Sequence, residues 1–442
     1  MAGDAGAGGR IVPRMASPFE SEQTASKRGT IGAVTVFRGH ILSPLSNGGW
    51  IELRDGTLEV EDGVIVSVGS AEKHDVDLRP NLIIPGFVDT HAHVPQLAIC
   101  GVHPDGLLSW LRKWVYPLEA EFQGGRAREL TKWFFREMLA NGTTSAALLT
   151  SAWPESVDIC FELAREYGVH AWIGPPLMDI GAYRRARVLE EAEELARRWD
   201  SKRQRFAVTP RFALSCSEEL LQGAGDLARA LDLPVQTHLN ENPDEIREVR
   251  HRFRRSYIEV YEDAGLVRPN SLFAHCVWMG KRDWKKVRRV SHCPGSNLFL
   301  KSGIMDWPAA TNSGALISLG SDVGAGPDLS IYRVMRQAWS IHATQKGQGP
   351  GPEELLRMAT LGGAEALGFQ DIGSLEPGRS ADFQVLDWNR IVPPGAPPAE
   401  SAHDLVSRIV HRGDRSAIRH VYVSGKLMPP PPETERRTRP VP

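Results

Sequence analysis

The sequence lacks the features that mark several broad classes of protein. No uninterrupted apolar run approaches the roughly 18 residues that a membrane-spanning helix needs. Lys and Arg total 52 against 54 Asp and Glu, so the formal charge of -2 gives no electrostatic basis for binding nucleic acid or an anionic membrane. The first residues contain no apolar core of a secretory signal. We therefore expect neither a nucleic-acid partner nor a membrane partner.

Cysteine is scarce and follows no pairing pattern. The five cysteines are an odd number and no two have CxxC spacing, which does not suit a disulfide framework. We expect buried thiols in a reducing compartment and a cytoplasmic location. Because 41% of the residues are hydrophobic, the chain can bury a large core, and disorder of the whole chain is excluded.

Both ends of the chain differ from its middle. Residues 1–29 and 431–442 lack hydrophobic periodicity and are predicted to be disordered. Apolar and polar residues alternate in 30–83, where WIELRDG and TLEVEDG are interpreted as two short antiparallel strands, each ending in a turn. Similar strands are predicted in 369–430. The two segments together predict a small β-sandwich domain formed from both termini.

The segment 84–368 has a different pattern. Short apolar runs bounded by Gly or Pro alternate with stretches in which apolar residues have helical spacing. This alternation predicts an α/β fold, specifically a (β/α)8 TIM-like barrel rather than a doubly wound sheet. The eight predicted strands are 84–91, 143–150, 169–175, 205–210, 234–239, 271–276, 287–294 and 315–322.

Histidines and an aspartate lie at the ends of four predicted strands. The first strand leads into His91 and His93, and alternate residues of a strand point to the same face, so both imidazoles can reach one metal ion. His238, His275 and Asp322 lie at the ends of the fifth, sixth and eighth strands. Each could be structural by itself. Barrel enzymes place their catalytic groups at the C-terminal ends of the strands. The position of these histidines and Asp322 at such ends therefore favours a zinc or ferrous iron site.

Glu241 follows His238 by three residues and is the candidate for proton transfer. It could equally be an acidic residue at the start of a helix, capped by Asn240 or Asn242. A divalent metal lowers the pKa of bound water from 15.7 to about 7, so a carboxyl group beside it indicates hydrolysis at an electrophilic carbon.

Longer motifs resemble those of the amidohydrolase superfamily. The segments PGFVDTHAH (85–93) and GSLEPGRSADFQVLD (373–387) are typical of the superfamily as a whole. A closer resemblance, to its barrel-type guanine deaminases, rests on further motifs in the expected order: LLSWLRKWVYPLEAEF (107–122), TPRFALSCS (209–217), QTHLNENPDEI (236–246), SHCPGSNLFLKSG (291–303) and GSDVGAG (320–326). The resemblance covers about 31–428.

The resemblance implies a reaction and roles for individual residues. The reaction would be zinc-dependent deamination of guanine to xanthine and ammonia. Glu241 would move protons to the purine and the leaving ammonia, His275 would hydrogen-bond the attacking water, and Asp322 would accept its proton. The implied ligands of one zinc ion per subunit, with Fe²⁺ as an alternative, are His91, His93, His238 and Asp322.

The resemblance also implies how a purine is held. Gln96 and Arg211 would bind its polar edge, because Arg offers a rigid fork of donors, and Phe212 would pack on its ring. Without the motifs around them, each is more often an ordinary loop or core residue. Members of the family are usually homodimers, which we expect here.

Several alternatives remain at this point. A related deaminase could act on 8-oxoguanine, cytosine, a pterin or an s-triazine, and Glu241 would suit all of these. A two-metal hydrolase would need a bridging lysine, but Lys202 is the sole lysine between 143 and 237 and precedes a strand. A catalytically inactive scaffold would be expected to have lost ligands that this sequence retains.

Overall fold

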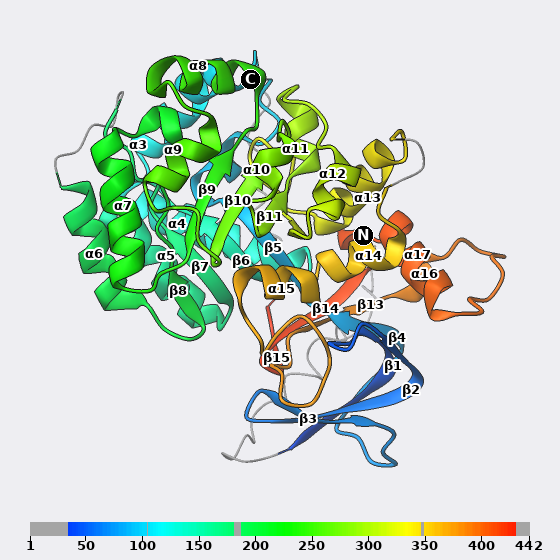
Figure 1. The fold of residues 1–442 in the computed structure, drawn as a ribbon. Helices are drawn as coiled ribbons and strands as arrows, with labels where there is room; N and C mark the ends of the chain where they lie inside the picture. The colour runs from blue at the N-terminus through cyan, green and yellow to red at the C-terminus, as the bar shows by residue number, and fades with distance from the viewer. Residues whose placement is uncertain (1–33, 104, 181–186, 346–348, 430–442) are drawn as a thin grey trace, which may run out of the picture.

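The computed structural model describes residues 34–103, 105–180, 187–345 and 349–429 (Figure 1). The segments 1–29 and 431–442, predicted to be disordered, lie outside the described residues. Two four-stranded parallel sheets and a seven-stranded sheet form the framework of an α/β fold. Among the described residues, no helix is both long and apolar enough to cross a membrane.

All eight parallel strands predicted between 84 and 368 are present. They are β5 (Phe87–His93), β6 (Thr143–Leu149), β7 (His170–Gly174), β8 (Gln204–Phe206), β9 (Val235–Leu239), β10 (Ser271–His275), β11 (Arg289–His292) and β12 (Leu316–Leu319). The first four form one sheet in chain order and the last four form the other. Backbone hydrogen bonds join the two sheets at both junctions. Gln236 N donates to Val208 O (3.0 Å) at one, and Asp322 N donates to His91 O (2.8 Å) at the other.

The start of the first parallel strand differs from its prediction. Residues 84 and 85 end a strand of the seven-stranded sheet, and β5 begins at Phe87. Gly86 lies between the two strands, where a Cβ atom would be 2.1 Å from Oγ1 of Thr144. The close approach of the neighbouring strand therefore requires glycine at this change of sheet.

Helices connect and cover the parallel strands. Those between β5 and β9 are α2 (Leu107–Trp110), α3 (Tyr116–Ala120), α4 (Gly124–Ala140), α5 (Pro154–Tyr167), α6 (Val188–Trp199) and α7 (Glu218–Ala230), with 3-10 turns at Val94–Ile99 and Ala213–Ser215 and a π turn at Leu111–Val115. Those up to β12 are α8 (Pro243–Phe253), α9 (Tyr257–Asp263), α10 (Lys281–Trp284), α11 (Pro294–Phe299) and α12 (Trp307–Asn312). After β12 come α13 (Ile331–His342), α14 (Pro352–Met358), α15 (Leu361–Leu367), α16 (Trp388–Ile391), α17 (Ala402–Arg412) and the 3-10 turn Arg415–Ala417.

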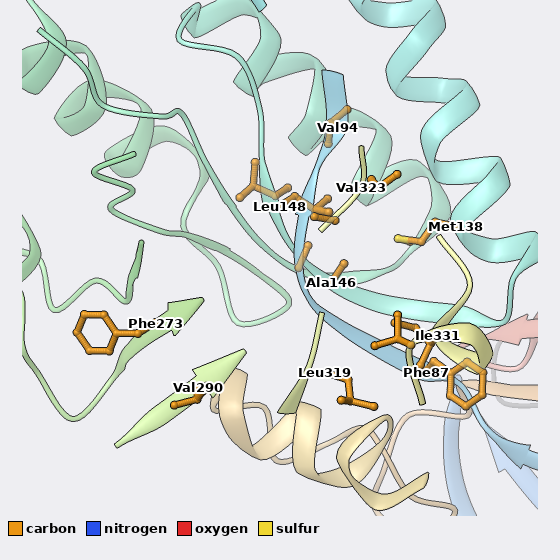
Figure 2. Close-up of a cluster of buried hydrophobic side chains, with 14 of the residues drawn as sticks. Phe87, Val94, Met138, Ala146, Leu148, Phe273, Val290, Leu319, Val323 and Ile331 are labelled. Atoms are coloured by element: carbon orange, nitrogen blue, oxygen red, sulfur yellow. The ribbon is translucent and has the colours of Figure 1, made fainter. Parts of the chain in front are cut away.

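The parallel strands are buried on both faces, as their continuous apolar sequences predict. Ala146 and Leu148 of β6 lie in one large apolar cluster with Met138 of α4 (Figure 2). The alternate residue Ala147 instead packs in a second cluster with Trp172 of β7 and residues of α15. The two faces of the strands therefore contribute to separate parts of the core.

The seven-stranded sheet combines strands from both ends of the chain, which lie together below the helices in Figure 1. Its order is β15 (Lys426–Leu427), β14 (Ile418–Val423), β13 (Phe383–Leu386), β4 (Val76–Pro85), β1 (Thr35–Pro44), β2 (Trp50–Glu61) and β3 (Val64–Gly69). Phe37, Phe383 and Tyr422 pack at its centre, with ring centroids 4.6–5.2 Å apart. Strands far apart in the sequence thus share one apolar core.

Two details of this sheet correct the sequence interpretation. WIELRDG and the residues TLEVE that follow it form the single strand β2, without a turn at Gly56. Gly56 lies opposite Gly39, where the ladder shifts register, and a Cβ atom at Gly56 would be 2.7 Å from that of Leu53. Gly56 therefore permits an irregular strand pairing rather than a turn. The second correction is that β4 runs parallel to β1, whereas antiparallel strands were predicted.

The cysteines are free thiols, as the sequence predicts. Cys100 is half-buried and the other four are buried.

Candidate functional site

The ends of the parallel strands bring three predicted histidines into direct contact. The Nε2 atom of His91 lies 3.3 Å from that of His93 and 3.2 Å from that of His238, and His93 and His238 are also 3.3 Å apart. Oδ1 of Asp322 lies 3.4 Å from His91 Nε2 and 3.3 Å from His93 Nε2. One small ion can contact all four of these groups.

The charge states of these groups suit a divalent cation. Burial lowers the pKa of His93 to about 4, and burial together with His91 lowers the pKa of His238 well below its ordinary value. Burial would raise the pKa of Asp322, but its contacts with His91 and His93 outweigh burial and hold that pKa well below the usual range. Neutral imidazoles and an ionised carboxylate are the forms that ligate zinc.

Hydrogen bonding also orients the imidazole of His238. Its Nδ1 lies 2.6 Å from the backbone oxygen of Arg211 and, facing a carbonyl, carries the hydrogen. The lone pair is then on Nε2, which faces the other two histidines. Three Nε2 atoms this close to one another suit a cation between them better than they suit direct contact with one another.

A buried aspartate, Asp89, braces the two strand ends that carry these groups. Its Oδ1 accepts hydrogen bonds from the backbone N–H of His91 (3.2 Å) and Ser321 (2.9 Å). Burial raises the pKa of Asp89 to about 6. Asp322 itself has φ +47° and His275 has φ +71°, a conformation that non-glycine residues rarely adopt and that is often found at functional sites.

His275 lies between two carboxyl groups. Its Nε2 is 3.5 Å from Glu241 Oε2 and 3.8 Å from Asp322 Oδ2, and has no hydrogen-bond partner among the described residues. Its Nδ1 lies 2.9 Å from the amide oxygen of Asn297, which accepts its hydrogen. His275 also lies within 4.8 Å of the ligand atoms of His91, His238 and Asp322, so proximity alone admits it as a ligand. The Nε2 atom of His93, however, lies closer to a carboxylate oxygen of Asp322 than the Nε2 atom of His275 does.

Glu241 is buried beside these groups. Ser302 Oγ donates to its Oε1 at 3.0 Å, and burial together with Asp322 raises the pKa of Glu241 to about 8. Its carboxyl group can therefore hold a proton near neutral pH. Of the two helix caps considered, Asn242 is the one present, since its Oδ1 accepts from Asp244 N (2.9 Å) at the start of α8.

A cavity opens beside the cluster, with a volume of about 400 Å³ that includes its mouth. Glu241 and all three residues predicted to hold a base line it, together with apolar side chains of Leu107, Trp110, Leu111 and Leu300. The predicted residues and the histidine cluster therefore share one pocket.

Glu119, for which the sequence predicted no role, connects two of these predicted residues. Gln96 Nε2 donates to Glu119 Oε1 at 3.0 Å, and Arg211 Nη1 forms an ion pair with Glu119 Oε2. Glu119 belongs to α3 and not to a strand end. The expectation that catalytic groups of a barrel lie at strand ends therefore did not identify it. Its only signal was its place within the 107–122 motif.

Comparisons with known proteins agree with this geometry. Residues 82–428 match the model of the Amidohydrolase family. The sequence is 34% identical to guanine deaminase from Escherichia coli K12, over 85% of this chain and 91% of the relative. Among solved structures, guanine deaminase from C. acetobutylicum with guanine in its active site has a TM-score of 0.82 and 30% identity, covering 90% of this chain and all of that one. An adenosine deaminase from Xanthomonas campestris with bound zinc has a TM-score of 0.80 and 25% identity, with 89% and 92% covered. The barrel-like α/β fold is common to these structures, and the chain belongs to the amidohydrolase family.

Proposed function

We propose that this protein is a guanine deaminase, which converts guanine and water to xanthine and ammonia. The observation that carries this proposal is the shared cavity, in which Gln96, Arg211 and Phe212 stand beside Glu241 and the histidine cluster. Similarity to guanine deaminases along most of the chain supports the same substrate.

The metal in this proposal is one zinc ion per chain, with Fe²⁺ as the alternative. His91, His93, His238 and Asp322 would hold it, because the three Nε2 atoms lie 3.2–3.3 Å from one another and Oδ1 of Asp322 lies 3.3–3.4 Å from two of them. The ion, when bound, supplies a water whose pKa is lowered to about 7.

The protein's own residues then move the protons. Asp322, ionised and buried, accepts the proton of the attacking water, and His275 hydrogen-bonds that water through Nε2. The water oxygen bonds to C2 of guanine as the C2–N3 double bond opens, and N3 takes a proton from Glu241, whose raised pKa lets it hold one near neutral pH. Glu241 then takes the remaining hydroxyl proton and passes it to the exocyclic nitrogen, so that ammonia leaves as C2 forms its carbonyl group. The proton held by Asp322 then restores Glu241.

The purine is held through its edge and its face. Arg211 donates from its guanidinium to the ring carbonyl oxygen, and Gln96 contacts the polar edge. Phe212, only 6% exposed, packs against the ring. Apolar side chains around the base keep water out, which strengthens each of these polar contacts.

Ammonia release tests the proposal. The zinc-loaded protein is given guanine, 8-oxoguanine, cytosine, adenine, pterin and melamine in parallel, with a chelated sample as the control. Turnover of guanine to xanthine, lost on chelation, is the expected result. Preferred turnover of another heterocycle would reject guanine as substrate while retaining the chemistry, and no turnover by zinc-loaded protein would reject deamination.

Further proposals concern the whole protein. We propose that the two four-stranded sheets close as one barrel, which the backbone hydrogen bonds at both junctions support. The β-sandwich form of the small domain and its bounds of 30–83 and 369–430, with the barrel at 84–368, stay predictions. So do the homodimer and the cytoplasmic location. Light scattering of the purified protein tests the homodimer.

A further inference from the structure

Glu119 is a buried carboxylate in contact with two residues of the proposed purine site. It belongs to α3 and is 3% exposed. One oxygen accepts from Gln96 Nε2 at 3.0 Å, and the other pairs with Arg211 Nη1. Gln96 and Arg211 are themselves 2% exposed. Neither residue can exchange this partner for bulk water without a rearrangement of the pocket.

The contact with Glu119 determines which atoms Gln96 can offer a ligand. An ionised carboxylate only accepts hydrogen bonds, so the amide nitrogen of Gln96 must face Glu119. The amide oxygen is then the group left to accept an N–H from a bound base. Arg211 similarly uses Nη1 for Glu119 and keeps its other N–H groups for the ligand.

The contact also balances charge. The charge of Arg211 is costly to bury, and the ion pair with the equally buried Glu119 compensates it. Removal of one partner from a buried ion pair leaves the other charge uncompensated. Without Glu119, the base-binding side of the cavity would carry the positive charge of Arg211 and attract anions.

We propose that Glu119 is a positioning residue that orients Gln96 and Arg211 and makes the purine subsite select neutral bases over anionic ones. This inference rests on the proposed deamination of guanine. It has a consequence for turnover. Xanthine has a carbonyl group where guanine has an amine and loses a ring proton more readily, so a charge-balanced subsite disfavours the product anion.

Two substitutions separate positioning from charge. Glu119→Gln keeps the shape and removes the charge, whereas Glu119→Asp keeps the charge and shortens the side chain. Glu137→Gln is the matched control, because Glu137 forms an ion pair with Arg415 outside the cavity lining. Guanine kinetics and equilibrium dialysis with urate, an anion, and hypoxanthine, a neutral base, are measured on each zinc-loaded protein.

For E119Q we expect KM for guanine to rise by at least about tenfold, a change in binding free energy of about 1.4 kcal/mol. The ratio of urate affinity to hypoxanthine affinity should rise by about tenfold or more. E119D should raise KM while leaving that ratio near its wild-type value, and E137Q should change neither. A merely structural role for Glu119 would not change the charge preference.

Three results would overturn the inference: an unchanged affinity ratio in E119Q, an equal rise in the ratio in E119D, or wild-type protein that binds urate as tightly as hypoxanthine. The comparison of urate with hypoxanthine on wild-type protein tests the inference even if E119Q does not fold. Failure of the proposed function would be distinct, since wild-type protein would then leave guanine intact while dialysis still reports the charge preference.

Discussion

Glu241 offers the most direct test of the chemistry. The change Glu241→Gln keeps the shape of the side chain and removes the proton that its raised pKa allows it to hold. We expect zinc content to stay at wild-type level while kcat for guanine falls by about 10²- to 10⁴-fold, the usual contribution of a positioned acid or base. Metal analysis and steady-state kinetics measure both. Retained turnover would remove Glu241 from proton transfer.

The guanidinium fork of Arg211 can be tested separately from its charge. Arg211→Lys keeps a positive charge beside Glu119 but replaces the planar fork with a single ammonium group. We expect kcat/KM for guanine to fall by about 10- to 100-fold, because hydrogen bonds to a charged group contribute roughly 1.5–3 kcal/mol. Arg415→Lys is the control, since Arg415 pairs with Glu137 outside the cavity lining. Equal kinetics in the two variants would contradict a role for the Arg211 fork.

The sequence predicted those residues that follow a simple rule. His91, His93 and His238 could be predicted because strand periodicity, together with the position of catalytic groups at the strand ends of barrels, places them at one end of parallel strands. Asp89 and Glu119 could not be predicted in this way. Their partners, Ser321 and Arg211, are distant in the sequence, and a lone acidic residue within a motif does not reveal which distant groups it contacts.

Among the elements, α8 begins immediately after the residues of the site. Asn242 caps it, accepting from Asp244 N, and Glu241 directly precedes this cap. We expect Asn242→Ala to lower the free energy of unfolding by about 0.5–2 kcal/mol, as other cap removals do. It should also lower kcat by up to about 100-fold, because small displacements of a catalytic group are costly.

The comparison for this prediction is Asp306→Ala. Asp306 caps α12 in the same way, with Oδ1 accepting from Ala309 N at 3.1 Å, but lines no part of the cavity. Urea unfolding and kinetics should show a similar loss of stability in both variants and a loss of activity in Asn242→Ala alone. Similar activities would show that the cap does not position Glu241.

The elements themselves were predictable where local pattern decides structure. Apolar runs between Gly or Pro residues located all eight parallel strands, because a strand buried on both faces needs continuous apolar sequence. The prediction failed at Gly56, which looks like a turn in sequence. There the pairing with β1, and not the local residues, determines that β2 continues.

Considered as a whole, the molecule depends on contacts between the parallel strands and the seven-stranded sheet. His170 begins β7 and is fully buried against residues of the segment between α15 and β13. Its Nε2 lies 3.3 Å from Asp371 Oδ2 and its Nδ1 lies 3.5 Å from Asp382 Oδ2. Asp382 also receives the backbone N–H of Ser424 at 2.7 Å. One imidazole therefore connects a parallel strand with segments near the C-terminal end of the chain.

This connection should make stability depend on pH. Burial and Arg203 oppose protonation of His170, but Asp371 and Asp382 outweigh them, so its pKa is raised above the ordinary value of 6.5. A raised pKa in the folded state means stability that is fully present below about pH 6.5 and is lost as pH rises through the folded pKa. His170 likewise lowers the pKa of Asp371, so that part of the stability is lost as pH falls toward the acidic range.

The test compares urea unfolding between pH 5.5 and 8.5 for wild type, His170→Gln and His251→Gln. His251 lies exposed on α8 and serves as the control for the loss of one histidine. The stability of wild type relative to His170→Gln should be greatest at pH 5.5 and should shrink as pH rises across this window, whereas His251→Gln should run parallel to wild type. Parallel slopes in all three proteins would mean that protonated His170 does not hold the two parts together. A slope of opposite sign that disappears in His170→Gln would mean that burial outweighs the two carboxylates.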